Sequence, residues 1–242
     1  MCTLIIATGV FGESGLFVIA NRDEDLDRPA EAPSIHERGG MRILAPRDLK
    51  AGGTWLGLNA AGVFAGITNR FRLPSKPRHR SRGELPFHAL QHSSARRSAD
   101  AIAGLSAEDY NGFHLVMADD NEAFVVWNDT EELHREMLAP GYHVITERSF
   151  GAAPSQRLQR IRERLTDLGE WSDETSARLQ NWMAEHDADN PLESTCVHLE
   201  ERNYGTRSST IVEIDDPWRF EHASGSPCNA QYRDFESELE RL

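Results

Sequence analysis

Short apolar, β-rich runs at both ends of the 242-residue chain, with helix-like segments between them, place the strongest constraint on its fold. Near the start, residues 3–8 (TLIIAT) and 16–20 (LFVIA) are two such runs, and the glycines at the ends of 12–15 are typical of a hairpin turn. Similar runs return late in the chain, at 195–199, 209–214 and 219–223. Antiparallel strands with grouped helices predict an α+β fold rather than a doubly wound parallel sheet.

The central part of the chain adds a second hairpin and the helices. Residues 54–59 and 63–68 predict the hairpin, whereas 25–50 and the basic stretch 70–82 are interpreted as irregular loops. We expect a β-meander within 113–146 and helices over 84–104, 155–168 and 173–185. No internal repeat or linker divides the sequence, so we expect one domain over residues 1–242.

The charge balance and the motifs that are missing narrow the classes of function. Asp and Glu number 39 against 26 Lys and Arg, and the net charge of −13 argues against nucleic acid or an anionic membrane as a partner. We expect no membrane insertion, because no apolar run approaches the roughly 20 residues of a membrane span. We expect no secretory leader, because residues 1–10 lack a basic region and Glu13 interrupts the apolar stretch. Three widely separated cysteines fit the reducing cytoplasm. The commonest nucleotide, zinc and serine-hydrolase motifs are absent, so we assign no metal site and no required cofactor.

Cys2 is the first candidate functional residue. If Met1 is removed, Cys2 carries a thiol and a free α-amine on one residue. An α-amine titrates at about 7.7–8.0, near enough to neutrality to take the thiol proton. Nucleophile and general base would then lie in one residue, as in an N-terminal-nucleophile enzyme. The alternative is an ordinary buried strand residue that follows the start codon.

The polar run Asn21–Glu24 directly follows the second apolar run. If residues 3–8 and 16–20 pair as a hairpin, Arg22 and Asp23 lie beside Cys2. A guanidinium there would favour the thiolate, and a carboxylate could orient the α-amine. The alternative is a surface ion pair at the end of a strand.

Three further motifs are candidates for parts of a site. Gly52–Gly57 contains Trp55 and paired glycines, which allow a close approach of another backbone segment. Asn69 directly follows the next predicted strand, and its side-chain amide could donate to an oxyanion. Arg207 in the segment 204–210 could bind an acidic substrate group. The alternative for Gly52–Gly57 and Asn69 is a glycine turn and a strand-terminal asparagine, and the alternative for 204–210 is an ordinary turn. Cys196 and His198 would share a face of a strand, as a Cys–His pair or as core packing.

The order of these motifs resembles that of one family. Six motifs are similar to those of the NRDE family, that of transport and Golgi organization protein 2. They are Met-Cys-Thr at the start, Asn-Arg-Asp-Glu at 21–24, Gly-Gly-Thr-Trp-Leu-Gly at 52–57, Thr-Asn at 68–69, Arg-Gly-Glu-Leu at 82–85 and Tyr-Gly-Thr-Arg-Ser-Ser-Thr at 204–210. The resemblance covers essentially the whole chain. That family resembles cysteine N-terminal-nucleophile hydrolases such as penicillin V acylases and bile salt hydrolases, which implies a four-layer αββα sandwich.

The resemblance also implies roles for individual residues. Cys2 matches the nucleophile, Arg22 and Asp23 set its charge and orientation, and Asn69 lies where an oxyanion-hole asparagine is expected. The residues implied to bind substrate or support the site are Asn21, Glu24, Trp55 and Arg207. One departure is Glu147, which stands where a Ser/Thr-Asn step is usual, and an ionised carboxylate cannot donate to an oxyanion.

These observations lead to two main hypotheses. In the first, Cys2 attacks the amide or acyl carbonyl of a small-molecule substrate and no cofactor is needed. In the second, the resemblance implies a non-catalytic protein that binds and traffics haem, acyl-CoA or lipid, through a site we do not assign. A third hypothesis is a structural relic of the hydrolase fold with an unrelated partner. The sequence assigns no oligomeric state.

Overall fold

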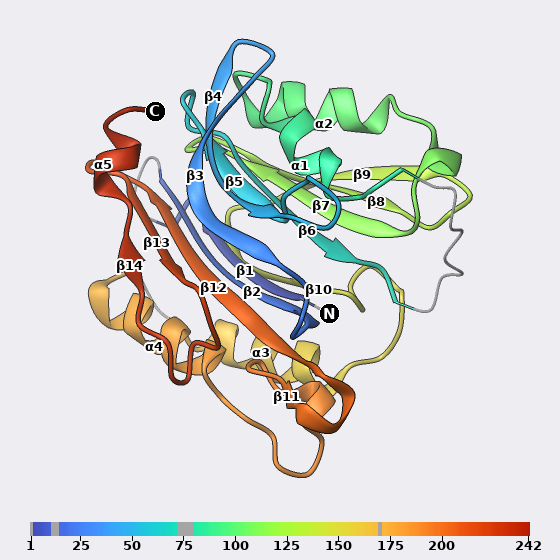
Figure 1. Ribbon diagram of the computed structural model, residues 1–242, viewed down its shortest axis with the longest axis vertical. Helices are drawn as coiled ribbons and strands as arrows, with labels where there is room; N and C mark the ends of the chain where they lie inside the picture. Colours follow the sequence, from blue (N-terminus) through green and yellow to red (C-terminus); the bar gives the residue numbers. More distant parts are fainter. Residues whose placement is uncertain (1, 11–14, 72–79, 169–170) are drawn as a thin grey trace.

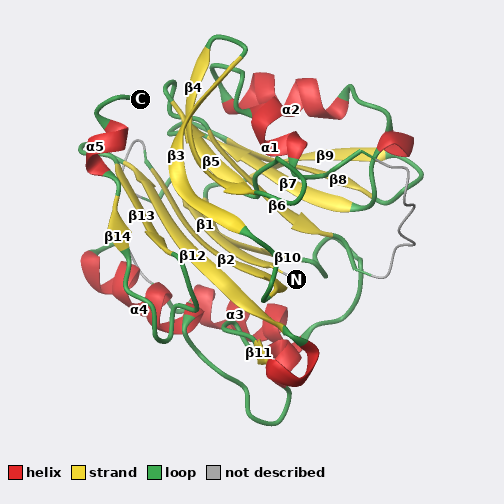
Figure 2. Ribbon diagram, viewed as in Figure 1, coloured by secondary structure: helices red, strands yellow, loops and turns green. Residues whose placement is uncertain are grey.

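Two stacked antiparallel sheets form the centre of the molecule (Figure 1; Figure 2). The computed structural model describes residues 2–10, 15–71, 80–168 and 171–242, and within these residues each sheet has seven strands. The first sheet has the order β10-β1-β2-β12-β13-β14, with β11 paired to β12: β1 (Cys2–Thr8), β2 (Leu16–Asp25), β10 (Gly141–Thr146), β11 (His198–Leu199), β12 (Tyr204–Ile214), β13 (Arg219–Ala223) and β14 (Arg233–Asp234). The second sheet runs in chain order: β3 (Ala30–Arg38), β4 (Met41–Asp48), β5 (Leu56–Asn59), β6 (Phe64–Asn69), β7 (Phe113–Ala118), β8 (Ala123–Asn128) and β9 (Leu133–Leu138).

Helices cover the outer face of each sheet and complete four layers (Figure 1). The helices are α1 (Glu84–Ala89) and α2 (Ala95–Ala103) on the second sheet, α3 (Gln156–Thr166) and α4 (Asp173–Met183) on the first, and the short α5 (Glu236–Leu239). Along β1, Leu4 and Ile6 belong to the core between the sheets, whereas Ile5 packs in the core beneath α3 and α4. Both faces of β1 are therefore buried, which explains its unbroken apolar run, and each such side chain contributes roughly 1.5–3 kcal/mol. The expected αββα sandwich is confirmed.

The predicted opening hairpin is also confirmed, and its register sets the geometry of the site. Strands β1 and β2 are antiparallel, with Cys2 opposite Arg22 and Thr8 opposite Leu16. Residues 11–14 of its expected turn lie outside the described residues. The second predicted hairpin corresponds to β5 and β6, with Leu56 opposite Gly66.

The expectation of an irregular loop over 25–50 is wrong, because most of this segment forms the hairpin of β3 and β4. Gly39 and Gly40 make its turn with φ values of +58° and +79°, which glycine adopts without strain. Pro33 and Pro46 do not prevent this pairing because the ladder skips both of them, at the register shift between the pairs Glu31–Arg47 and Ser34–Ala45. Of the basic stretch 70–82, residues 72–79 lie outside the described residues.

Other expected elements differ from the structure in extent. The helix expected over 84–104 is two helices, α1 and α2, and the Ser94 hydroxyl caps the second by accepting from the Arg97 N–H. The last strand of the expected meander, β10, leaves the second sheet and pairs with β1 in the first. The strand expected over 195–199 is shortened to the two residues of β11, which pair with the start of β12. None of the helices within the described part of the chain combines the length and apolarity that a bilayer crossing requires.

Candidate active site

The half-buried Cys2 begins β1 and lines a pocket with a volume of about 300 Å³ at the edge where the two sheets meet. β2 contributes Arg22, Asp23 and Glu24 to this pocket, and the facing sheet and its loops contribute Trp55 and Asn69. Six of the eight predicted site residues therefore line one pocket: Cys2, Arg22, Asp23, Glu24, Trp55 and Asn69. Burial raises the pKa of the Cys2 thiol above its ordinary value.

The Arg22 guanidinium is held beside the thiol by an aromatic ring and a carboxylate. Its Cζ lies 4.4 Å from the ring centroid of Trp55, a cation–π distance, and Nη2 lies 3.6 Å from a Glu24 oxygen. Only 5% of the Arg22 side chain is exposed. Arg22 is opposite Cys2 in the β1–β2 register, so the sequence prediction that places these residues together is confirmed by the strand pairing.

Asp23 is buried and accepts a hydrogen bond from a neighbouring strand. The Thr206 hydroxyl on β12 donates to Asp23 Oδ1 at 2.7 Å and itself accepts from the Val197 N–H at 2.8 Å. The Arg157 guanidinium lies 3.5 Å from Asp23 Oδ2. Burial nevertheless raises the pKa of the Asp23 carboxyl, against the opposing effects of Arg157 and the Thr206 hydroxyl.

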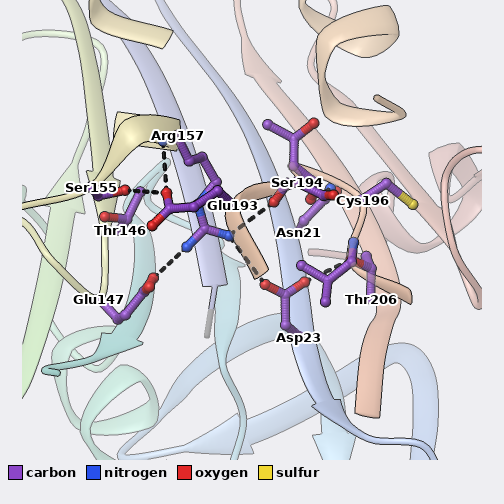
Figure 3. A network of polar contacts seen from close by, with 12 residues as sticks. Asn21, Asp23, Thr146, Glu147, Ser155, Arg157, Glu193, Ser194, Cys196 and Thr206 are labelled. Carbon is purple, nitrogen blue, oxygen red and sulfur yellow. Dashed lines mark hydrogen bonds and ion pairs between the residues drawn. The ribbon is translucent and has the colours of Figure 1, made fainter. Parts of the chain in front are cut away.

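Arg157 on α3 connects two buried carboxylates behind the pocket (Figure 3). Its Nη2 donates to Glu147 Oε2 at 2.5 Å, and its Nη1 donates to the Ser194 carbonyl oxygen at 3.2 Å. The exposed fractions of the Arg157 and Glu147 side chains are 1% and 3%. Glu147, which replaces the expected asparagine, thus forms an ion pair with Arg157, and it lies outside the pocket lining.

Arg157 was missed in the sequence analysis, although the helix pattern carried a signal for it. Arg157, Ile161 and Leu165 follow each other at intervals of four, and all three are buried. A charged residue on the apolar stripe of a helix needs a buried partner, because an unpaired charge is rarely buried. Which carboxylate would pair with it could not be read from the sequence, because Glu147 precedes the helix and Asp23 lies on β2.

Asn21 and Arg207 are not brought into the pocket. The Asn21 amide donates to the carbonyl oxygens of Met183 and Thr195, at 2.8 and 2.9 Å, and so ties β2 to the end of α4. Arg207 lies at a bulge of β12 and donates to the Arg28 carbonyl oxygen at 3.3 Å. It lines a neighbouring cavity that shares Arg22 and Trp55 with the pocket around Cys2. Both residues therefore lie outside the lining of the pocket around Cys2, and their supporting role stays a prediction.

Two glycine motifs meet at the rim of the pocket. The Thr54 N–H donates to the Gly83 carbonyl oxygen at 2.8 Å. A Cβ atom on Gly53 would lie only 2.4 Å from backbone atoms of Gly83, so no larger residue fits there. This contact holds Arg82 at the pocket, where its Nη1 donates to the Gly112 carbonyl oxygen at 2.9 Å. The close backbone approach that the paired glycines predict is confirmed.

An αββα sandwich with a cysteine at the start of a central strand, facing a pocket, defines the fold class of the N-terminal-nucleophile hydrolases. Solved structures of this class resemble the chain over most of its length. An N-acylethanolamine-hydrolyzing acid amidase ortholog of Caenorhabditis elegans matches with a TM-score of 0.61 and 13% identity, over 86% of this chain and 91% of the other. A penicillin V acylase from Agrobacterium tumefaciens matches with a TM-score of 0.57 and 11% identity, over 99% and 88%. A conjugated bile acid hydrolase from Clostridium perfringens matches with a TM-score of 0.55 and 12% identity, over 99% and 94%. At these identities the likeness shows the fold.

The sequence itself identifies the family. The family described as Transport and Golgi organisation 2 matches residues 1–222, and the chain belongs to this family. The Mus musculus homolog of Transport and Golgi organization 2 is 37% identical over 109 residues, which are 43% of this chain and 38% of the mouse protein. The Bos taurus homolog is 34% identical over 135 residues, which are 52% of this chain and 48% of the bovine protein. The match thus spans less than half the length of each of these relatives.

Proposed function

We propose that this chain is a cysteine N-terminal-nucleophile hydrolase that cleaves a non-peptide amide or related acyl bond of a small molecule. The observation that carries the proposal is the meeting of Cys2, Arg22, Asp23 and Asn69 at one pocket. The similar solved structures are named as an amidase, an acylase and a hydrolase of conjugated bile acids, which supports an acyl compound as the substrate class.

The reaction begins once removal of Met1 frees the α-amine of Cys2. Because burial raises the pKa of the thiol, a base beside it must take its proton, and the α-amine is placed to do so. The Cys2 sulfur then forms a bond to the acyl carbon, and the carbonyl π electrons move onto oxygen, where the Asn69 amide donates a hydrogen bond. Collapse of this intermediate breaks the C–N bond, and the leaving amine takes the proton from the Cys2 ammonium.

Hydrolysis of the resulting thioester completes the cycle. A water molecule gives a proton to the Cys2 α-amine and attacks the acyl carbon, and the C–S bond breaks. The departing thiolate regains its proton from the ammonium, and the carboxylic acid is released. Throughout, Asp23 orients the α-amine, and Arg22, fixed against Trp55, stabilises negative charge on sulfur.

Intact mass of the purified protein, before and after a thioester or activated-amide probe, tests the proposal. We expect loss of Met1 and a single acyl adduct that peptide mapping assigns to Cys2. A mature Cys2 that never forms the adduct, or a fully retained Met1, would contradict the enzymatic reaction because the base would be missing.

Replacement of Asn69 by alanine is expected to slow acylation by about 10²–10³-fold, the usual cost of losing one oxyanion donor. Asn69 is exposed at the end of β6, so the free energy of unfolding should change little. The rate of adduct formation by intact mass measures the effect, with Asn121→Ala in an exposed turn as the control. An unchanged rate in Asn69→Ala would remove this residue from the oxyanion site.

Reversible binding of haem or acyl-CoA, the alternative that the family resemblance implies, stays a prediction. Equilibrium titration with haem, followed at the Soret band, tests it. Saturable 1:1 binding by a protein that retains Met1 would favour this alternative over hydrolysis.

A further inference from the structure

Four side chains with metal-binding atoms converge at a place outside the pocket around Cys2. One ligand atom from each of His186, Cys196, His198 and Cys228 lies within 4.8 Å of every other. They come from the segment after α4, the segment that enters β11, and the loop after β13. Cys196 and His198 are candidates for a pair from the sequence, whereas His186 and Cys228 lie 10 residues before Cys196 and 30 residues after His198, where no short motif indicates them.

The distances fit the edges of a tetrahedral coordination sphere. His198 Nε2 lies 3.4 Å from the sulfur of Cys196 and 3.4 Å from the sulfur of Cys228. In a tetrahedral zinc site, bond lengths of about 2.3 Å to sulfur and 2.0–2.1 Å to nitrogen separate neighbouring ligand atoms by roughly 3.3–3.8 Å. The widest separation in the cluster would therefore close by only about 1 Å on metal binding.

The surroundings of the cluster prepare one of its histidines as a ligand. His186 Nδ1 lies 2.9 Å from the Cys196 carbonyl oxygen, which can only accept, so Nδ1 carries the proton and Nε2 keeps the lone pair. Histidine ligands of metals usually donate their second ring N–H to a carbonyl or carboxylate in this way.

Backbone and side-chain hydrogen bonds hold the three segments in place. The Cys196 N–H donates to the Glu185 carbonyl oxygen at 3.0 Å, next to His186. The Ser226 hydroxyl donates to the Thr206 carbonyl oxygen at 2.7 Å, which anchors the loop of Cys228 against β12.

We propose that His186, Cys196, His198 and Cys228 form a structural site for zinc. Two thiols release their protons to solvent, and the two thiolates and two neutral imidazoles bind one Zn²⁺, with no change of oxidation state. Four protein ligands fill a tetrahedral sphere and leave no position for substrate, which is typical of a structural rather than a catalytic zinc. Thiolate and imidazole ligands favour zinc over calcium or magnesium.

The zinc would fasten the segments that support the candidate active site. Cys196 lies between Thr195 and Val197 in the chain. The Thr195 carbonyl oxygen accepts from the Asn21 amide. The Val197 N–H donates to the Thr206 hydroxyl, which donates to the Asp23 carboxylate. Figure 3 shows Cys196 beside Thr206 and Asn21 in this network. The site would thus stabilise the part of β2 that carries the predicted catalytic residues, without entering the pocket.

Zinc titration of the full chain, reduced and stripped with a chelator under anaerobic conditions, tests the proposal. We expect uptake of one Zn²⁺ per chain and a rise in Tm of roughly 5–10 °C at a free zinc concentration about 100 times Kd. Substitution with Co²⁺ should give the absorption of a tetrahedral site with thiolate ligands.

Variants at exposed ligands keep the test independent of folding. His186→Ala and Cys228→Ser should each lose the Tm rise and the cobalt spectrum, whereas Cys2→Ser and His134→Asn should keep both. Absence of stoichiometric uptake, or uptake that survives in Cys228→Ser, would overturn the proposal. A Cys196–Cys228 disulfide in the freshly purified protein would also overturn the proposal if the chain, once reduced, had no affinity for zinc.

Discussion

Replacement of Cys2 by alanine is expected to abolish acylation of the protein by a thioester or activated-amide probe, with a loss of at least about 10³-fold in rate. The alanine retains the α-amine after Met1 removal, so the general base is still present and only the nucleophile is lost. Cys2 is half-buried at the start of β1, and its replacement by a small side chain should leave the free energy of unfolding within about 1 kcal/mol. The initial rate of adduct formation, followed by intact mass, measures the loss.

The control for this experiment is peptide mapping of the labelled, unmodified sequence, because Cys228 is an exposed thiol that can react with the probe without catalysis. Mapping separates the adduct at Cys2 from nonspecific labelling at Cys228. If Cys2→Ala is acylated as fast as the unmodified sequence, the nucleophile lies elsewhere and the proposed reaction is wrong. Neither Cys196 nor Cys228 is replaced in this experiment, because both belong to the proposed zinc site.

The parts of the fold that the sequence predicted are those with a local signal. The β1–β2 hairpin follows from two apolar runs, and its register alone brings Arg22 opposite Cys2. Helix α3 follows from apolar residues at intervals of three and four, with Ser155 as its cap. The β3–β4 hairpin was missed because β3 is mostly polar and each strand contains a proline, although Gly39-Gly40 is a strong turn signal.

The parts of the site that the sequence did not predict depend on contacts between distant segments. Strand β10 crosses to the first sheet, and this crossover carries Glu147 to Arg157, a pair that no local pattern specifies. Asn21 belongs to the same short motif as Arg22 but faces the opposite side of β2, where it binds Met183 and Thr195. Alternation along a strand therefore places Arg22 and Glu24 on one face of β2 and Asn21 and Asp23 on the other, and of the latter two only Asp23 also lines the pocket.

Replacement of Arg157 by methionine is expected to destabilise the protein by about 3–5 kcal/mol at neutral pH, because Asp23 and Glu147 would lose their shared buried cation. For a chain of this length the corresponding fall in Tm is roughly 6–20 °C.

The loss of stability in Arg157→Met should also depend on pH. Burial already raises the pKa of Asp23, and loss of the guanidinium removes an influence that lowers it. A carboxyl whose pKa is raised in the folded state contributes stability at low pH and loses it as the pH rises through the folded-state pKa. The variant should therefore be closest to the unmodified protein at about pH 5 and furthest from it at about pH 8.

Arg164→Met on the same helix is the matched control for this prediction. Arg164 pairs with Glu185 at 2.7 Å, but its side chain is 36% exposed, so solvent screens the ion pair and its loss should cost at most about 1 kcal/mol at either pH. Thermal or urea unfolding of both variants and the unmodified sequence at the two pH values measures the difference. Equal and pH-independent losses in the two variants would contradict the role assigned to Arg157. If instead Arg157→Met shows the larger, pH-dependent loss, the cation on α3 holds the charge of Asp23 and Glu147 behind the nucleophile.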